Sequence, residues 1–188
     1  NGITWRIWDI CYFTHSGDNE FTKPHLVIVP DSALYSHVMN DTNTTEGGYV
    51  GSKMYKEGLE QAKTTIKAAF GDMLLTHRDY LTNAVTDGKP SAGGWFDSQV
   101  ELMNEIMVYG CHVHTPGGDG ATVPYNYTTG RQQFAAAMLN PSIVNLRYWY
   151  WLRDVVSSAY FAHVNYGGGA SYDNASDSNG VRPYFLIG

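Results

Sequence analysis

The segment from residue 154 to residue 180, DVVSSAYFAHVNYGGGASYDNASDSNG, constrains the fold of this chain more than any other feature. It contains no Lys, Glu, Gln, Met, Trp or Arg. The aromatic block YWYWLR (148–153) stands directly before it, and the run GVRPYF (180–185) closes it. This pattern indicates a rigid frame that holds an insert of unusual composition.

The insert is rich in Tyr, Ser, Gly and Asn, which are the residues enriched in antibody combining loops. The alternative is a low-complexity loop that only connects two elements. Against that alternative, Tyr160, His163, Tyr166 and Tyr172 stand among the small residues of the segment. The composition therefore favours recognition, and it does not identify a ligand.

A shared codon property unites the positions that we interpret as exchangeable. Each of their residues can be encoded by an asparagine codon, AAC or AAT, whose first two adenines are kept or replaced. Lys, Glu, Gln, Met and Trp cannot be reached in this way, and they are missing from the segment. The candidate ligand-binding residues are Tyr160, His163, Asn165, Tyr166, Gly167, Ser171, Tyr172, Asp173, Asn174, Asp177 and Asn179.

The WLR block, the adenine-accessible insert and the closing GVRP resemble the variable proteins of diversity-generating retroelements, over about the last 40 residues. In that family, adenine-directed mutagenesis diversifies the end of a C-type-lectin-like receptor-binding domain. The resemblance implies one such domain over residues 1–188, with its variable ligand-binding region at about 148–185. It further implies two main helices packed on antiparallel sheets, paired terminal strands and a long C-terminal binding loop.

The resemblance also implies what the protein does and where. We expect a receptor-binding module without enzymatic activity, an adhesin at a phage or prophage virion tail or at a cell surface. Its partner would be a host cell-surface protein or glycan. A homo-oligomer such as a trimer, and attachment to a tail or fibre component, are left open.

Bulk properties set limits on other classes of function. The length of 188 residues suits a single domain, and the order of elements alone gives an α+β class. Charged residues make up 16% of the chain and the net charge is −6, without a basic cluster, so we expect no binding to nucleic acid. No apolar run approaches the roughly 18 residues of a membrane span, so we expect no membrane insertion.

Hydrophobic periodicity and turn residues predict the elements. Strands are expected at 3–10, 26–30, 148–152, 161–164 and 181–187. Long helices are expected at 52–70 and 99–109, the second behind a Ser98 cap, and short helices at 76–81 and 133–139. Loops are expected at 87–94 and 114–130.

The frame around the insert should be buried. Arg153 and Arg182 are interpreted as internal anchors, because guanidinium groups bind carbonyls and carboxylates bidentately. The alternative is that one of them contacts the ligand directly. The predicted core residues are Trp149, Trp151, Leu152, Phe161, Val164, Val181 and Phe185.

Metal sites and catalysis have weaker support. The run Cys111-His112-Val113-His114 offers soft ligands, but structural zinc needs four. Asp173, Asn174 and Asp177 could supply oxygens to a hard cation, although the calcium-binding triplets of sugar-binding lectins are missing.

We therefore expect no metal, no cofactor and no catalytic residue. Cys11 and Cys111 are expected to be two buried thiols, with a single bridge between them as the alternative. The alternatives are a lectin-like enzyme or metal-dependent sugar binder at these clusters, and a fixed structural tail or fibre domain.

Overall fold

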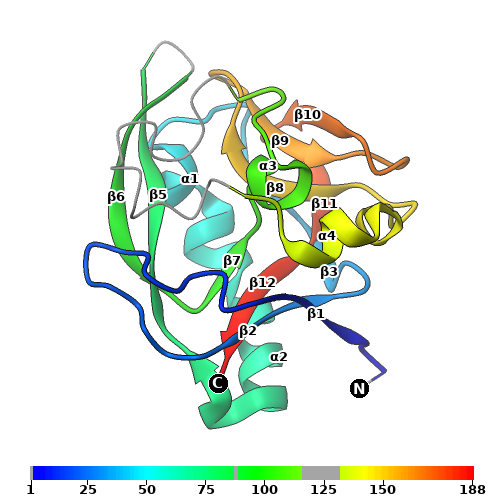
Figure 1. Ribbon diagram of the computed structural model, residues 1–188. Coiled ribbons are helices and arrows are strands. Elements are labelled where there is room, and N and C mark those ends of the chain that lie inside the picture. Colours follow the sequence, from blue (N-terminus) through cyan, green and yellow to red (C-terminus); the bar gives the residue numbers. More distant parts are fainter. Residues whose placement is uncertain (1, 87–88, 116–131) are drawn as a thin grey trace.

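The protein is an α+β molecule in which β-sheets predominate (Figure 1). The computed structural model describes residues 2–86, 89–115 and 132–188. The strands are β1 (Trp5–Ile10), β2 (Leu26–Pro30), β3 (Tyr35–Val38), β4 (Leu74–Leu75), β5 (His77–Thr86), β6 (Lys89–Ser98), β7 (Val100–Leu102), β8 (Tyr150–Val155), β9 (Tyr160–Val164), β10 (Ala170–Asn174), β11 (Ser178–Val181) and β12 (Pro183–Ile187). The helices are α1 (Gly48–Gly51), η1 (Met54–Gly58), α2 (Glu60–Phe70), η2 (Gly71–Met73), α3 (Glu105–Tyr109), α4 (Ala135–Leu139) and η4 (Pro141–Val144).

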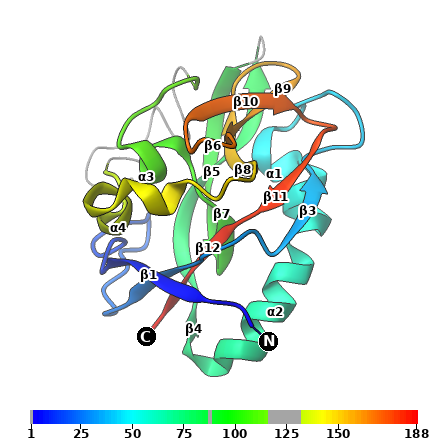
Figure 2. The same ribbon diagram turned by 90° about the vertical axis from the view of Figure 1, so that its right-hand side faces the viewer.

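The first sheet has the order β1-β2-β12-β4, and β7 also pairs with β12. Phe185 of β12 lies opposite Ile28 of β2 in an antiparallel register. The implied direct pairing of the terminal strands is therefore wrong, because β2 lies between them. Both termini nevertheless lie at the same end of the molecule (Figures 1 and 2).

The second sheet has the order β10-β9-β8-β11-β3 and holds the segment singled out in the sequence (Figure 2). All residues of β8 are buried, which suits a strand with side chains packed on both faces. β11 runs parallel to β8, with Gly180 opposite Tyr150. The implied long C-terminal binding loop is wrong, because about half of the insert forms β9, β10 and β11, and only short connections join these strands.

The predicted helix at 52–70 is confirmed as the continuous stretch of η1 and α2, with α1 just before it. Its apolar spacing places Ala62 and Ile66 against Ile28, Val100 and Phe185 of the first sheet. α2, the longer part of this stretch, lies at the bottom of the molecule in Figure 1, away from β9 and β10.

The second long helix, predicted at 99–109, is wrong. Val100–Leu102 form β7, and only Glu105–Tyr109 is helical. The helix begins behind Asn104, whose side chain accepts a hydrogen bond from the Met107 amide at 2.8 Å. Asn104, and not Ser98, therefore supplies the N-cap. The apolar residues that predicted one long helix are divided between a short strand and a short helix.

The short helix at 76–81 is also wrong, and so is the loop over residues 89–94, because β5 and β6 pair as an antiparallel hairpin. The first two residues of the predicted loop, 87 and 88, lie outside the described residues. His77, Asp79 and Leu81 are buried on β5, while Arg78 and Tyr80 between them are partly exposed. Two of the three inward side chains are polar, so the alternation typical of a strand was hidden. The short helix at 133–139 is confirmed by α4, and most of the loop at 114–130 lies outside the described residues.

The predicted core is confirmed except at one position. The buried members are Trp151, Leu152, Phe161, Val164, Val181 and Phe185. Trp149 is 50% exposed, so its assignment to the core is wrong. It directly precedes β8, and its carbonyl accepts from the Gly180 amide of β11 at 2.9 Å.

Candidate ligand-binding surface

Arg153 at the start of the insert is tied into the core. Its guanidinium group donates to both carboxylate oxygens of Asp79 on β5, at 2.7 and 3.2 Å, and all of these atoms are buried. The Tyr184 hydroxyl donates to the same carboxylate. Burial alone would raise the pKa of Asp79, but the charge of Arg153 brings it below its ordinary value. The prediction of an internal anchor is confirmed here.

Arg182 at the end of the insert is anchored as well. It donates from Nε to the Pro30 carbonyl at 2.9 Å and from Nη1 to the Tyr150 hydroxyl at 3.2 Å. Its guanidinium carbon also lies 4.8 Å from the ring centre of Trp8, a cation–π contact. Both arginines are buried, so neither side chain is placed to meet a ligand.

Between these anchors, β9 and β10 form a hairpin whose turn runs from residue 165 to residue 169. The Asn165 amide donates to the Gly169 carbonyl at 2.8 Å, and the Asn165 side-chain oxygen accepts from the amides of Gly167 and Gly169. Gly168 has a φ of 86°, which glycine adopts readily. Asn165 therefore shapes the turn, and Tyr166, 57% exposed, projects from it.

The hairpin register sorts the candidate side chains onto two faces. Asn174 lies opposite Tyr160 and Tyr172 opposite Ala162, so these side chains share one face. The rings of Tyr160 and Tyr172 lie 5.3 Å apart, and Tyr172 is 46% exposed. Ser171 pairs with His163, and these two lie on the opposite face with Asp173.

A group of carboxylates and amides occupies the connection from β10 to β11. Asn174 donates from Nδ2 to Asp177 at 3.0 Å, and Asn179 donates from Nδ2 to Asp173 at 3.3 Å. Burial and the neighbouring Asp177 raise the pKa of Asp173, while hydrogen bonds from Asp173 and Asn174 lower that of Asp177. Across the described ranges, no group of three or more His, Cys, Asp or Glu side chains could hold a metal ion.

Two of the candidate residues lie beneath the surface. His163 is 5% exposed, with its ring centre 6.2 Å from that of Trp149 and 6.1 Å from that of Trp151. Its Nδ1 atom has no hydrogen-bond partner among the residues placed by the structure. Burial, and to a lesser degree the charge of His114, lowers the pKa of His163 to about 4. Asn179 is buried too.

The structure thus brings together most of the candidate residues. Tyr160 and Tyr172 form a pair, and Asp173, Asn174, Asp177 and Asn179 form a hydrogen-bonded group. Tyr166 and Gly167 are exposed at the hairpin turn.

Sequence reasoning missed the exposed rings of Tyr148 and Trp149. In the run YWYW every position is aromatic, so no alternation separates inward from outward side chains.

The cysteines differ from expectation. Both are free, but Cys111 is exposed and Cys11 is partly exposed, so their predicted burial is wrong. The chain after Cys111 is held through its backbone, because the amides of Val113, His114 and Thr115 donate to the Glu105 carboxylate.

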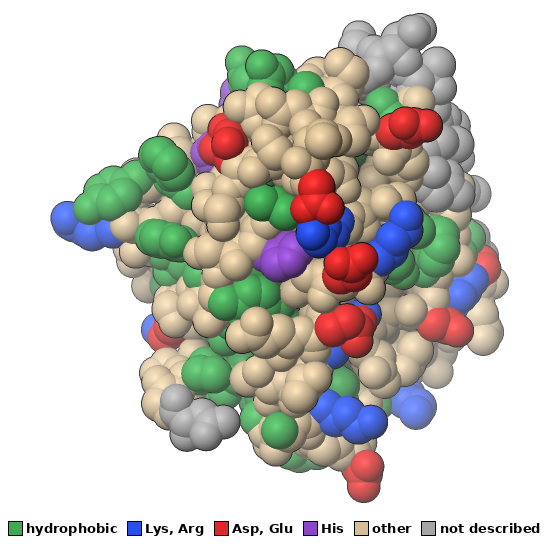
Figure 3. Space-filling view, turned by 180° about the vertical axis from the view of Figure 1, so that it is seen from behind, with side chains coloured by type: hydrophobic (Ala, Val, Ile, Leu, Met, Phe, Trp, Pro, Cys, Tyr) green, Lys and Arg blue, Asp and Glu red, His purple; other side chains and the backbone are tan. Residues whose placement is uncertain are grey.

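The surface charges are mixed on the face that carries α1, α2 and β3. Figure 3 shows acidic and basic side chains interspersed there. Lys53 pairs with Asp41 at 2.5 Å, and Lys63 with Glu60 at 2.8 Å. This face does not offer the concentrated positive charge that binding to phosphates requires. In addition, no helix among the described residues is both long and apolar enough to span a bilayer.

No protein-family model, curated protein or solved structure matches the chain. The class of site therefore rests on geometry: a β-hairpin at the edge of a sheet displays tyrosine, amide and carboxylate side chains between two buried arginine anchors. Such a surface has the residue types of a recognition site.

Proposed function

We propose that the chain is a ligand-binding module that displays a variable surface on β9, β10 and β11, as in the variable proteins of diversity-generating retroelements. It attaches to a host or cell-surface molecule and carries out no reaction. One observation carries the proposal: exchangeable and constant residues are held by different partners. Candidate side chains at 165–179 bond mainly within the insert, whereas Arg153 and Arg182 bond to β5 and β2.

The tyrosines supply the contact area of this surface. Tyr166 and Tyr172 are about half exposed, and Tyr160 supports Tyr172 from the neighbouring strand. Aromatic side chains dominate the energetics of many interfaces, and Tyr loses little conformational entropy on binding. The short polar side chains beside them can adapt their hydrogen bonds to different ligands.

The C-type-lectin-like fold is part of the same proposal. It is supported by the first and last strands, which share one sheet, and by the position of the insert between β8 and β12.

The test is the sequence of the encoding locus. The proposal expects a nearby reverse-transcriptase gene and a near-identical repeat of the segment that encodes residues 148–185. Mismatches between the two copies should fall at adenines in the codons of the candidate residues. The codons of Arg153 and Arg182 serve as the internal control and should be identical in both copies.

A locus without such a repeat would contradict the proposal, and so would mismatches spread evenly over the codons of β8 and β12. Either result would favour a fixed adhesin or a structural tail domain.

A further inference from the structure

A pocket lies beside β3, at the edge of the second sheet opposite to the β9–β10 hairpin. Its side chains differ in chemistry from those of the hairpin surface. Its cavity of about 320 Å³ lies between the β2–β3 connection and the chain that leads into β8. This volume falls in the range of small-molecule sites. The pocket is lined by Asp31, Ser32, Ala33, Tyr35, Ser36, Leu146 and Tyr148.

The polar groups of the pocket form two pairs. The Ser36 hydroxyl and the Tyr148 hydroxyl are 2.8 Å apart. Asp31 is held by Arg6, which donates from Nε and Nη2 to its two carboxylate oxygens at 2.6 and 2.7 Å. The Asp31 side chain stays 28% exposed, so its oxygens can accept further hydrogen bonds from a ligand.

The walls of the pocket are preformed. The Asp31 amide donates to the Thr4 carbonyl at 2.9 Å, and the Leu34 amide donates to the Val181 carbonyl at 2.9 Å. Gly180 on β11 allows Ala33 of the pocket wall to pack closely against this strand, because a Cβ at residue 180 would lie 2.7 Å from the Cβ of Ala33. A preformed pocket avoids the entropic cost of ordering its residues when a ligand binds.

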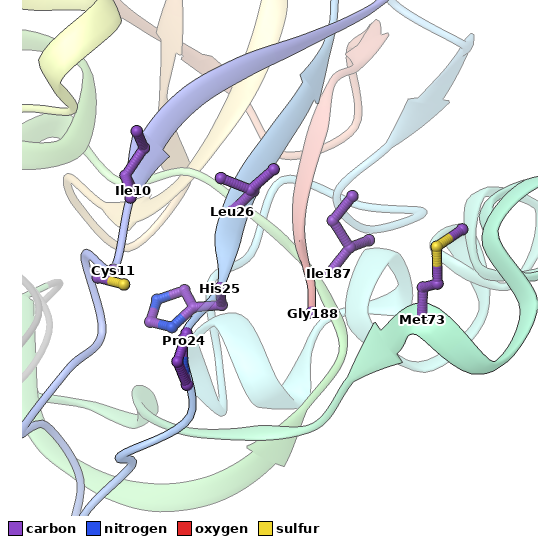
Figure 4. Close-up of a pocket in the computed structure, with 8 residues that line it drawn as sticks. All are labelled: Ile10, Cys11, Pro24, His25, Leu26, Met73, Ile187 and Gly188. Atoms are coloured by element: carbon purple, nitrogen blue, oxygen red, sulfur yellow. The ribbon is translucent and has the colours of Figure 1, made fainter.

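A second pocket, of about 330 Å³, lacks these features (Figure 4). Ile10, Leu26 and Ile187 line it from three strands, and Met73 lies across from them. The His25 ring that also lines it uses both nitrogens, one accepting from the Phe13 amide and the other donating to the Lys23 carbonyl. Few polar atoms there are free to orient a ligand, so this pocket carries no proposal.

The chemistry of the pocket beside β3 defines what fits it. A carboxylate can accept from two adjacent hydroxyl groups, and Ser and Tyr hydroxyls can both donate and accept. The half-exposed ring of Tyr148, together with Leu146 and Ala33, adds an apolar surface. We propose that this pocket binds a single polyhydroxylated ring of hexose size, a monosaccharide unit.

This site goes beyond the proposed function and does not rest on it. None of its lining residues is among the candidate ligand-binding residues of the insert, so the pocket does not depend on which side chains a variant carries at those positions. It would add a constant contact to a glycan, at a distance along the sheet from the varied contacts.

Saturation-transfer NMR on the whole chain tests the proposal, with D-glucose, D-galactose, D-mannose, L-fucose, L-rhamnose and N-acetyl-D-glucosamine as separate probes at millimolar concentration. At least one sugar should receive saturation at its ring protons. Tyr148→Ala should abolish this signal, and Asp31→Asn should weaken the affinity about tenfold by removing a charged acceptor. Tyr148→Phe should retain part of the signal, because it keeps the ring.

Tyr172→Ala is the matched control, because it removes a half-exposed tyrosine from the variable surface and should leave sugar binding unchanged. Circular dichroism melting establishes that each variant is folded. The proposal is overturned if no sugar on the panel binds the native chain. It is equally overturned if binding survives Tyr148→Ala or is lost in folded Tyr172→Ala. The locus test of the variable surface is independent of all these outcomes.

Discussion

The strands that frame the insert and the hairpin within it are stabilised in different ways. Arg153 and Arg182 bind groups that lie 74 and 152 positions away in the chain. The polar side chains of the hairpin bind within a few residues, as Asn165 does with Gly167 and Asn174 with Asp177. A substitution in the hairpin therefore leaves few partners unsatisfied elsewhere, whereas removal of Arg153 takes the cation away from the buried carboxylate of Asp79.

Removing a frame arginine should have the largest effect. Arg153→Met leaves the buried carboxylate of Asp79 without its charged partner, and we expect the free energy of unfolding to fall by about 3–5 kcal/mol. Urea denaturation at pH 7, followed by tryptophan fluorescence, measures the change. The exposed Arg147 is the matched control, and Arg147→Met should stay within about 0.5 kcal/mol of the native chain. Equal losses of unfolding free energy in the two variants would show that Arg153 stabilises the fold no more than an exposed arginine does.

Alanine substitutions at two glycines, Gly180 in β11 and Gly167 in the hairpin turn, should have smaller effects on stability. A Cβ added at Gly180 would lie 2.7 Å from Ala33 Cβ and 2.8 Å from the Trp149 carbonyl oxygen, so Gly180→Ala should cost about 1–3 kcal/mol. A Cβ added at Gly167, in the hairpin turn, would meet only Asn165 Oδ1 at 3.5 Å. Gly167→Ala should change stability by less than about 0.5 kcal/mol. Denaturation midpoints measure both, and a costly Gly167→Ala would show that the hairpin is packed like the frame.

At neutral pH the titration of the buried His163 should produce the smallest effect of all, and its contribution to stability emerges only as the pH is lowered. Burial keeps the ring neutral in the folded protein, with a pKa of about 4, while the unfolded chain protonates it near 6.5. The unfolded state therefore binds more protons between these values, and stability falls as pH drops from 6.5 to 4. His163→Asn should make this loss less steep in denaturation curves measured across the window.

Other groups contribute to the same pH profile, so the difference between the variant and the native chain is the decisive quantity. Burial lowers the pKa of His77 to about 4, and this residue adds a loss of the same sign. Burial raises the pKa of Glu101 to about 7, and its contribution falls as pH rises from 4.5 to 7. An identical slope in His163→Asn would show that this ring is not held neutral.

The elements that could be predicted have the apolar runs or hydrophobic periodicity typical of their type of secondary structure. Leu26–Pro30 is an apolar run ended by proline, and it matches β2. β5 was missed because His77 and Asp79 face inward, and their burial depends on Arg153 and Tyr184 far away in the chain. A pairing between such distant residues leaves no periodic signal in a single sequence.

The candidate site was located by a codon property that is independent of any fold. That property selects the hairpin, but it cannot separate exposed from buried members, because burial depends on the register of β9 against its neighbours. His163 pairs with Ser171 on one side and Trp151 on the other, and it is covered. Tyr172, one strand further out, is half exposed.

The direct passage from β11 to β12 has a mechanical consequence. Only Arg182 separates these strands, which belong to different sheets, so a pull on the hairpin is transmitted straight into β12. That strand is bonded to β2 on one side and to β4 and β7 on the other. A pull on the hairpin would therefore be distributed over the hydrogen bonds that join β12 to all three of these strands.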